Sequence, residues 1–264
     1  MSIFADARYA QLAASSRDAY GRADPFPHAV FDDFLPDEVA RRALAEFPGV
    51  GADWHRYDNA RERKLASRED RHFGPATRAL LHELNALDFL KFLEALTGIG
   101  GLISDPHYEG GGLHQIERGG RLGVHADFNY HPIYRLDRRI NVLIYLNEGW
   151  RDEWHGHLEL WDGSMSRCAK KVAPLFNRCV VFNTTDDAFH GHPEPLACPP
   201  EVTRKSLALY YYSNGRPARE AAGQHSTLFR RRPHEVNGPV AWAVSQARHR
   251  VALTFRKLAR LAEP

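Results

Sequence analysis

The spacing of apolar residues divides this chain into a helical first part and a strand-rich middle. Apolar side chains recur at helical spacing over residues 37–47 and 75–97, with a break expected near Asn85. Residues 1–24 are polar and rich in alanine and predict a helical arm, and residues 28–34 predict a short strand. The front half of the chain is therefore expected to be mainly helical.

Residues 51–74 are densely charged and lack a clear period. This texture is typical of a solvated loop, and a mobile flap is the alternative interpretation.

From residue 100 the pattern changes to short runs rich in Val, Ile, Leu, Tyr and Phe, separated by Gly- and Asn-containing turns. Many short strands at regular spacing indicate a sandwich or a barrel. Together with the helical front half, they predict an α+β protein with a β core. The expected strands are Leu113–Glu117, Gly123–Asp127, Ile140–Leu146, His157–Trp161, Lys171–Ala173, Cys179–Asn183 and Ser206–Ser213.

We predict one structural domain with three parts: a helical flank (1–99), a β core (100–215) and a C-terminal extension (216–264). Within the extension, apolar residues from Val240 to Leu258 recur at helical spacing opposite a row of Arg and Lys. This predicts a basic amphipathic helix that covers a core, and a membrane surface or an acidic partner is the alternative.

Composition excludes several classes. The chain has 264 residues, of which 43% are hydrophobic and 26% charged, with a formal net charge of +2, as in an ordinary globular protein. This balance argues against nucleic-acid binding, and no apolar run is long enough to span a membrane. The three cysteines form no CxxC pair, and no signal-peptide pattern opens the chain, so we expect a reducing cytoplasmic location.

Histidine gives the first chemical lead, because eight of the 15 histidines lie between His107 and His192. In the expected strand around His125-Ala126-Asp127, His125 and Asp127 point to the same face. His190 is the expected third ligand. Two histidines and one carboxylate leave the opposite side of a metal ion open, as in non-haem Fe(II) oxygenases. A zinc hydrolase and ordinary polar core residues are the competing interpretations.

A second group of polar residues lies on later strands. Arg204 and Ser206 share one face of their strand, and Lys205 points away. An arginine fork beside a hydroxyl suits the capture of a carboxylate. Tyr145, on a preceding apolar strand, can reach the same carboxylate, and Lys205 is the alternative anchor if Arg204 does not serve.

These segments resemble a known family. The Fe(II)/2-oxoglutarate-dependent dioxygenases, and within them the prolyl 4-hydroxylase-like branch, are similar over residues 100–215 and weakly over 25–40. The segments that carry the resemblance are HAD (125–127), NVLIYLNEGW (141–150), HGHLELWD (155–162), FH (189–190) and TRKSLALYYY (203–212).

The resemblance implies a double-stranded β-helix (jelly-roll) core with flanking N-terminal helices and a C-terminal helix. It also implies Fe(II) held by His125, Asp127 and His190, with 2-oxoglutarate and O2 as co-substrates. Arg204, helped by Ser206 and Tyr145, would then hold the distal carboxylate of 2-oxoglutarate. The implied reaction is hydroxylation of an unactivated C–H bond, with succinate and CO2 as co-products.

The chain departs from the family pattern in two ways. The branch often uses Lys rather than Arg as the anchor, and His155-Gly156-His157 keeps one glycine where the family tends to have two. We expect His155, His157 and His192 to be neighbours of the site or turn residues rather than ligands.

The substrate is not determined by these patterns. Gln115, Asn129, Tyr130 and His131 are candidate substrate contacts, the last three in a segment (128–139) that can act as a lid. We expect a small molecule or an amino-acid derivative as substrate. A prolyl or other residue of a peptide or protein is the alternative, and a jelly-roll module that binds without turnover is a third possibility. The oligomeric state stays open.

Overall fold

The computed structural model describes residues 2–51, 53–220, 223–233 and 235. Met1–Arg230 forms one compact unit, and everything below concerns that unit. The expected basic helix near Val240–Leu258 lies outside the described residues. No helix among the described residues is long and apolar enough to cross a membrane.

The N-terminal part supplies the helices, as expected. Asp6 caps the first long helix by accepting a hydrogen bond from the Arg8 backbone N–H (2.9 Å). The expected break at Asn85 separates two helices, and Gly98 ends the second one with φ of 75°. The helices are α1 (Ala7–Gly21), α2 (Asp37–Ala45), α3 (Pro75–Asn85) and α4 (Leu87–Thr97), with short 3-10 turns η1 (Ile3–Ala5), η2 (Asp70–His72), η3 (Asp152–Trp154) and η4 (Ala218–Glu220).

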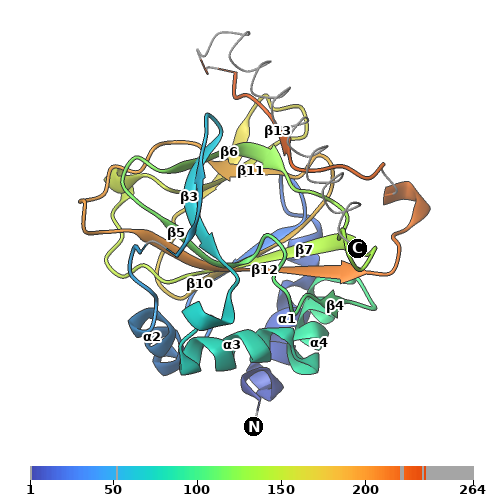
Figure 1. Cartoon of the computed structure of the whole chain (residues 1–264). Helices are drawn as coiled ribbons and strands as arrows, with labels where there is room; N and C mark the ends of the chain where they lie inside the picture. Colours follow the sequence, from blue (N-terminus) through green and yellow to red (C-terminus); the bar gives the residue numbers. More distant parts are fainter. Residues whose placement is uncertain (1, 52, 221–222, 234, 236–264) are drawn as a thin grey trace, which may run out of the picture. The chain divides into compact units, whose positions relative to one another are not determined.

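The strands form one antiparallel sheet that curls round so that one of its faces is turned inward (Figure 1). Its order is β1-β10-β7-β12-β5-β3-β6-β11-β8-β9, with β13 on β6, β2 on β3 and β4 on β12. The strands are β1 (His28–Phe31), β2 (His55–Asp58), β3 (Glu62–Ser67), β4 (Ile103–Ser104), β5 (Gly112–Ile116), β6 (Arg121–Ala126), β7 (Asp137–Tyr145), β8 (Leu158–Trp161), β9 (Cys168–Val172), β10 (Arg178–Asn183), β11 (Phe189–His192), β12 (Arg204–Ser213) and β13 (Leu228–Phe229). This confirms the α+β class with a jelly-roll core.

The main hydrophobic core lies between the helices and one side of the sheet. In Figure 1 all four helices lie below β7, β10 and β12. Aromatic rings of η1, α1 and α4 (Phe4, Tyr9, Phe89) pack against one another there, and Leu207 and Leu209 of β12 close the core from the sheet side. Because this face of β12 packs against the helices, its alternate residues must point to the inward face of the sheet.

The prediction of a loop over residues 51–74 was wrong. The segment forms the β2–β3 hairpin and η2, and β3 is hydrogen-bonded to both β5 and β6. The charges of Glu62, Arg63 and Lys64 hide the two-residue period of this strand. The buried residues of this strand, Leu65, Ala66 and Ser67, are confined to its second half. The hairpin therefore forms part of the curled sheet, between β5 and β6.

Three further strands were not expected. The short strands β4 and β13 are two residues long, and β11 occupies a stretch for which no strand was expected. The other strands lie where their patterns predict them, within a few residues at each end. The unexpected β11 matters most, because it places His190 within the sheet.

Candidate metal centre

The pairing of β6 with β11 brings His125, Asp127 and His190 together. His190 lies directly opposite His125 in the register of the two strands. A bulge follows, so that His192 pairs with Leu122. Each of the three residues is at most 9% exposed. The spacing within the sequence HAD and the strand register together create the cluster.

Gly191, between the two histidines of β11, lies too close to β6 for any side chain. A Cβ atom there would be 2.8 Å from the backbone oxygens of both Gly123 and Leu122. We expect Gly191→Ala to push β11 away from β6 and lower the free energy of unfolding by about 1–3 kcal/mol. Thermal or urea denaturation measures this, with Gly100→Ala, whose surroundings are open and whose φ is not positive, as a comparison for the general cost of adding a methyl group. An unchanged transition for Gly191→Ala would show that the strands tolerate the spacing.

The geometry of the cluster suits a metal ion. The ligand atoms of the three residues all lie within 4.8 Å of one another. Asp127 Oδ1 is 3.4 Å from His125 Nε2, and Oδ2 is 3.3 Å from His190 Nε2. Two imidazoles and a carboxylate are the donor set typical of non-haem Fe(II) sites.

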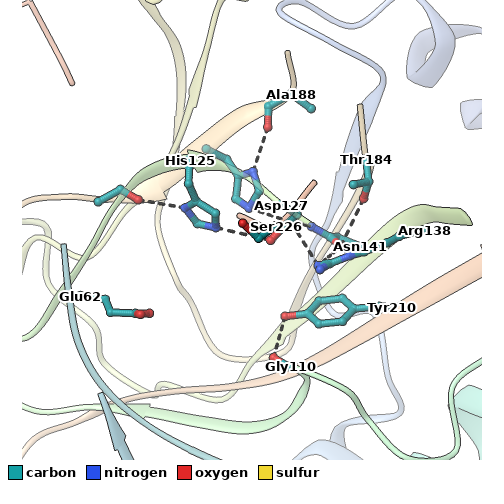
Figure 2. Close-up of polar contacts among 12 residues, drawn as sticks. Glu62, Gly110, His125, Asp127, Arg138, Asn141, Thr184, Ala188, Tyr210 and Ser226 are labelled. Atoms are coloured by element: carbon teal, nitrogen blue, oxygen red, sulfur yellow. Dashed lines mark hydrogen bonds and ion pairs between the residues drawn. The ribbon is translucent and has the colours of Figure 1, made fainter. Parts of the chain in front are cut away.

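Both imidazoles are held in the form that binds a metal. His125 Nδ1 lies 2.9 Å from the Gly123 carbonyl oxygen, and His190 Nδ1 lies 3.0 Å from that of Ala188 (Figure 2). A carbonyl can only accept, so each Nδ1 donates, and Nε2 of the neutral ring carries the free lone pair. Burial lowers the pKa of His190 to about 4, which keeps its ring neutral. His125, Asp127 and His190 therefore suit an Fe(II) ion.

Asp127 is kept ionised by its neighbours. Burial alone raises its pKa, but the charge of Arg138 and the neighbouring rings of His190 and His125 outweigh this and hold the pKa well below its ordinary value. Arg138 Nη2 lies 3.1 Å from Asp127 Oδ2, and Asn141 Nδ2 donates to the same oxygen at 2.6 Å. These two side chains fix the orientation of the carboxylate (Figure 2).

Arg138 was not identified from the sequence. It is fully buried, and its guanidinium lies over the rings of Tyr210 (3.4 Å) and Phe128 (4.3 Å). Its Nη1 is buried and has no hydrogen-bond partner among the described residues. The available signal was a pair of arginines, Arg138 and Arg139, near the start of a strand that is otherwise mostly apolar and buried. A charge placed there needs a partner, which is Asp127.

Arg204 occupies another part of the same interior face. It is 4% exposed, donates from Nε to the Gly156 carbonyl oxygen (2.8 Å), and from Nη2 to the Tyr145 hydroxyl (3.2 Å). Burial lowers its pKa, and only Tyr145 opposes this. In the part of the chain that the structure describes, no carboxylate pairs with Arg204. A buried guanidinium of this kind fits a carboxylate ligand.

The strand register groups the other expected anchors with Arg204. Ser206 lies opposite Tyr145 on one side and opposite His114 on the other, so all three share the interior face. Lys205 pairs with Gln115 and points to the other side of the sheet. The alternation used to prefer Arg204 over Lys205 therefore agrees with the structure.

The candidate substrate contacts are only partly brought to this site. Gln115 lies on the outer face of β5, donating to Thr203 Oγ1 (2.9 Å), so the structure does not support a contact with substrate; its neighbour His114 faces inward instead. His131 is fully buried, and its Nδ1 accepts hydrogen bonds from the backbone N–H groups of Ile133 and Tyr134, which is the role of a turn residue.

Asn129 and Tyr130 belong to the segment that follows the metal cluster. Tyr130 forms an isolated bridge with Asp137. Asn129 is buried and hydrogen-bonds to residues 223–225, which follow the β core. Its Nδ2 donates to the Gly223 carbonyl oxygen (3.0 Å), and its Oδ1 accepts from the His225 backbone N–H (3.0 Å). The segment 128–139 is thus anchored at both ends.

We call residues 223–230 the C-terminal strap. Within it, β13 pairs with the end of β6, placing Leu228 opposite Ala126 and Phe229 opposite His125. The Phe229 ring lies 5.4 Å from the His125 ring. His225 Nε2 lies 2.8 Å from Asp186 Oδ1. The strap therefore covers the edge of the strand that carries His125 and leads directly into Asp127.

The three histidines expected to neighbour the site, His155, His157 and His192, lie in two different places. His157 lies near the surface, with Nε2 2.7 Å from Asp152 Oδ1, and lines a surface hollow with His155. His192 is 4% exposed and faces inward. Burial and the charge of Arg204 hold its pKa well below the ordinary value, so its ring is neutral.

Comparison with known proteins decides the family. The family model described as the 2OG-Fe(II) oxygenase superfamily matches residues 111–212. This segment belongs to the 2OG-Fe(II) oxygenase superfamily. The protein is a 2-oxoglutarate-dependent dioxygenase, with Fe(II) as its cofactor and 2-oxoglutarate and O2 as co-substrates. No curated protein sequence matches the chain.

Solved structures show that this oxygenase shares the prolyl 4-hydroxylase fold. A prolyl-4-hydroxylase from Pseudomonas putida aligns with 77% of this chain and 100% of its own, at 16% identity and a TM-score of 0.56. A prolyl hydroxylase from Trichoplax adhaerens, solved with a hypoxia inducible factor peptide fragment, aligns over 81% and 94%, at 15% identity and a TM-score of 0.57. Identities this low establish the fold and leave the substrate open.

Proposed function

We propose that this oxygenase hydroxylates a small molecule of the amino-acid type. His125, Asp127 and His190 bind Fe(II), and Arg204, with Tyr145 and Ser206, holds the distal carboxylate of 2-oxoglutarate. The substrate C–H bond and 2-oxoglutarate are both oxidised by one O2 molecule. One oxygen atom enters the substrate as a hydroxyl group, and the other enters succinate, with release of CO2.

One observation carries this assignment. A metal-binding triad and a buried arginine, which pairs with no carboxylate among the described residues, both lie on the inward face of the sheet. Bound iron, together with 2-oxoglutarate and O2, supplies the oxidising power for C–H chemistry. The protein's own residues bind and orient: Arg138 and Asn141 fix the carboxylate of Asp127, and the two backbone carbonyls fix the imidazoles.

The C-terminal strap supports a small substrate over a peptide. An extended peptide can add itself to a sheet through a free strand edge. Here the edge of β6 beside His125 is already paired with β13, and the Asn129 backbone N–H donates to the His225 carbonyl oxygen (3.4 Å). A peptide strand would have to displace the strap to pair at this edge.

Arg138 supports a substrate with an acidic group. Its Nη1 is buried beside Asp127 without a partner among the described residues, which is costly for a guanidinium nitrogen. A substrate carboxylate near the metal would give this nitrogen the acceptor it lacks. On the other side of the cluster, Figure 2 places Glu62 of β3, which pairs with Lys64 (3.3 Å). Charges of both signs thus border the region around the triad.

The test has two stages. Anaerobic addition of Fe(II) and 2-oxoglutarate to the purified protein should give a visible charge-transfer band, and absence of the band would overturn the metal and co-substrate assignment. In air, succinate release is then measured with free amino acids and small carboxylic acids in one arm and prolyl peptides in the other. We expect a product heavier by one oxygen atom in the first arm. Coupled turnover in the peptide arm alone would replace our proposal with peptide hydroxylation.

Cysteine chemistry supports a reducing compartment. Cys179 and Cys198 are buried and form no disulfide with another described residue. Because unpaired thiols are typical of the cytoplasm, we propose a cytoplasmic location.

A further inference from the structure

Glu62 is a charged residue on the inward face of the sheet that the proposed function leaves without a role of its own. In the register, Ala66 of β3 lies opposite His114 of β5, and His114 lies opposite Ser206 of β12. Ser206 shares its face with Arg204, so this face is the inward one. Glu62 lies four residues before Ala66 and, by strand alternation, faces the same way. Its side chain is 16% exposed.

The pairing of β3 with β6 brings Glu62 close to the metal triad. Glu62 lies opposite Leu122, and His125 follows three residues further along β6. Adjacent strands lie about 5 Å apart and each residue advances a strand by about 3.3 Å, so the Glu62 side chain can reach the neighbourhood of the His125 imidazole. Figure 2 shows it pointing from β3 toward the region between His125 and Tyr210. Glu62 therefore borders the region in which a substrate must place its C–H bond.

The Glu62 carboxylate has lone pairs left for a ligand. Its Oε2 lies 3.3 Å from Lys64 Nζ, and its Oε1 has one long contact, to Asn59 Nδ2 at 3.5 Å. A carboxylate has about four acceptor positions. Lys64 is also held by the Tyr57 ring, whose centroid lies 4.9 Å from Nζ. Acceptor positions, on Oε1 above all, therefore stay available for a donor that enters from the inward side.

We propose that Glu62 binds the ammonium group of the substrate. This inference rests on the proposed function and narrows it, because the substrate must then carry an amine as well as an acidic group. Hydrogen bonds between an ammonium donor and a carboxylate are roughly twice as strong as those between neutral groups. On the other side of the triad in Figure 2, Arg138 lies 3.1 Å from Asp127 and offers the complementary charge. An anionic and a cationic side chain thus flank the triad, as recognition of a zwitterion requires.

The experiment compares Glu62→Gln with the wild type on matched sets of compounds. Each set is a free L-amino acid, the same compound without its amino group, and the same compound with that group acetylated. Turnover is followed as succinate release and as the product heavier by one oxygen atom. For the free amino acid that the wild type oxidises best, we expect Glu62→Gln to lower kcat/KM roughly 10- to 100-fold, mainly through KM. For the des-amino and N-acetyl compounds the two proteins should be equal.

Asp58→Asn is the matched control. It makes the same change from carboxylate to amide on the same hairpin, at an exposed position opposite Arg63, which faces the other side of β3 from Glu62. We expect it to leave every value unchanged. Because Glu62→Gln leaves Lys64 without its partner, the double variant Glu62→Gln, Lys64→Met repeats the measurement without an unpaired charge. The affinity of Glu62→Gln for 2-oxoglutarate, measured by calorimetry on Mn(II)-loaded protein, should equal that of the wild type.

The outcomes separate this inference from the proposed function. Equal losses in Glu62→Gln for the free amino acid and its two analogues, or no loss for any of them, would overturn the role of Glu62. A wild-type enzyme that oxidises the des-amino acids as well as the amino acids would also overturn it, while hydroxylation of small molecules would stand. If the wild type binds 2-oxoglutarate but oxidises none of the small molecules, the inference fails together with the proposed small substrate.

Discussion

Replacing Arg204 with Ala is expected to weaken 2-oxoglutarate binding by roughly 100- to 1000-fold. The arginine is buried, and its loss would leave the distal carboxylate in an enclosed space without a counter-charge. Leaving one charge of a buried pair uncompensated costs about 3–5 kcal/mol, and each 1.4 kcal/mol corresponds to about tenfold in affinity. The charge-transfer band, titrated with 2-oxoglutarate in anaerobic Fe(II) protein, measures the change directly.

Lys205→Ala is the matched control for this experiment. It removes a neighbouring cation that faces the other side of β12, opposite Gln115. We expect no change in 2-oxoglutarate affinity. If Lys205→Ala weakens binding and Arg204→Ala does not, the anchor is Lys205 and the interior face of β12 has been misassigned. A melting curve for each variant separates lost binding from lost folding, because Arg204 also contacts Gly156 and Tyr145.

The second large effect is expected for Asp127→Ala, which should abolish measurable Fe(II) binding and all turnover. Asp127 contributes the only carboxylate of the triad and lies within 3.4 Å of both ligand nitrogens. Its removal takes away one ligand and the negative charge that offsets Arg138. Wild-type protein should melt at a higher temperature when Mn(II) is added, because an ion that binds the folded state stabilises it, and the variant should show no shift.

Asp186→Asn serves as the comparison, since it changes a carboxylate that contacts His225 and Asn129 but lies outside the triad. We expect it to retain metal-dependent stabilisation. A variant Asp127→Ala that still binds Fe(II) with wild-type affinity would exclude Asp127 as a ligand. The zinc or iron would then have to be held by other residues.

The sequence was most informative where periodicity and chemistry coincide. His125 and Asp127 share a face by simple strand alternation, and the same rule separates Arg204 from Lys205. The apolar strand around Tyr145 and the break at Asn85 follow from local composition. These features depend on neighbours within a few residues, so a sequence pattern can reveal them.

Features that depend on distant pairing were not recoverable in this way. Lys64 and Glu62 look like loop residues until β3 is placed between β5 and β6. The opposite faces taken by Gln115 and His114 follow from the pairing of β5 with β12. Arg138 is intelligible only once Asp127 is known to lie beside it, because burial of an arginine depends on a partner that sequence spacing does not disclose.

The C-terminal strap, residues 223–230, is coupled to the metal cluster through its contacts with β6 and His125. Because Phe229 contacts His125 and β13 pairs with β6, an ion that orders His125 also favours the attached strap. Thermodynamic reciprocity then requires that anything drawing the strap away from β6 lower the affinity for the ion by the same factor. Iron occupancy should therefore protect residues 223–230 from proteolysis, and a binder of that segment should act as an inhibitor without entering the site.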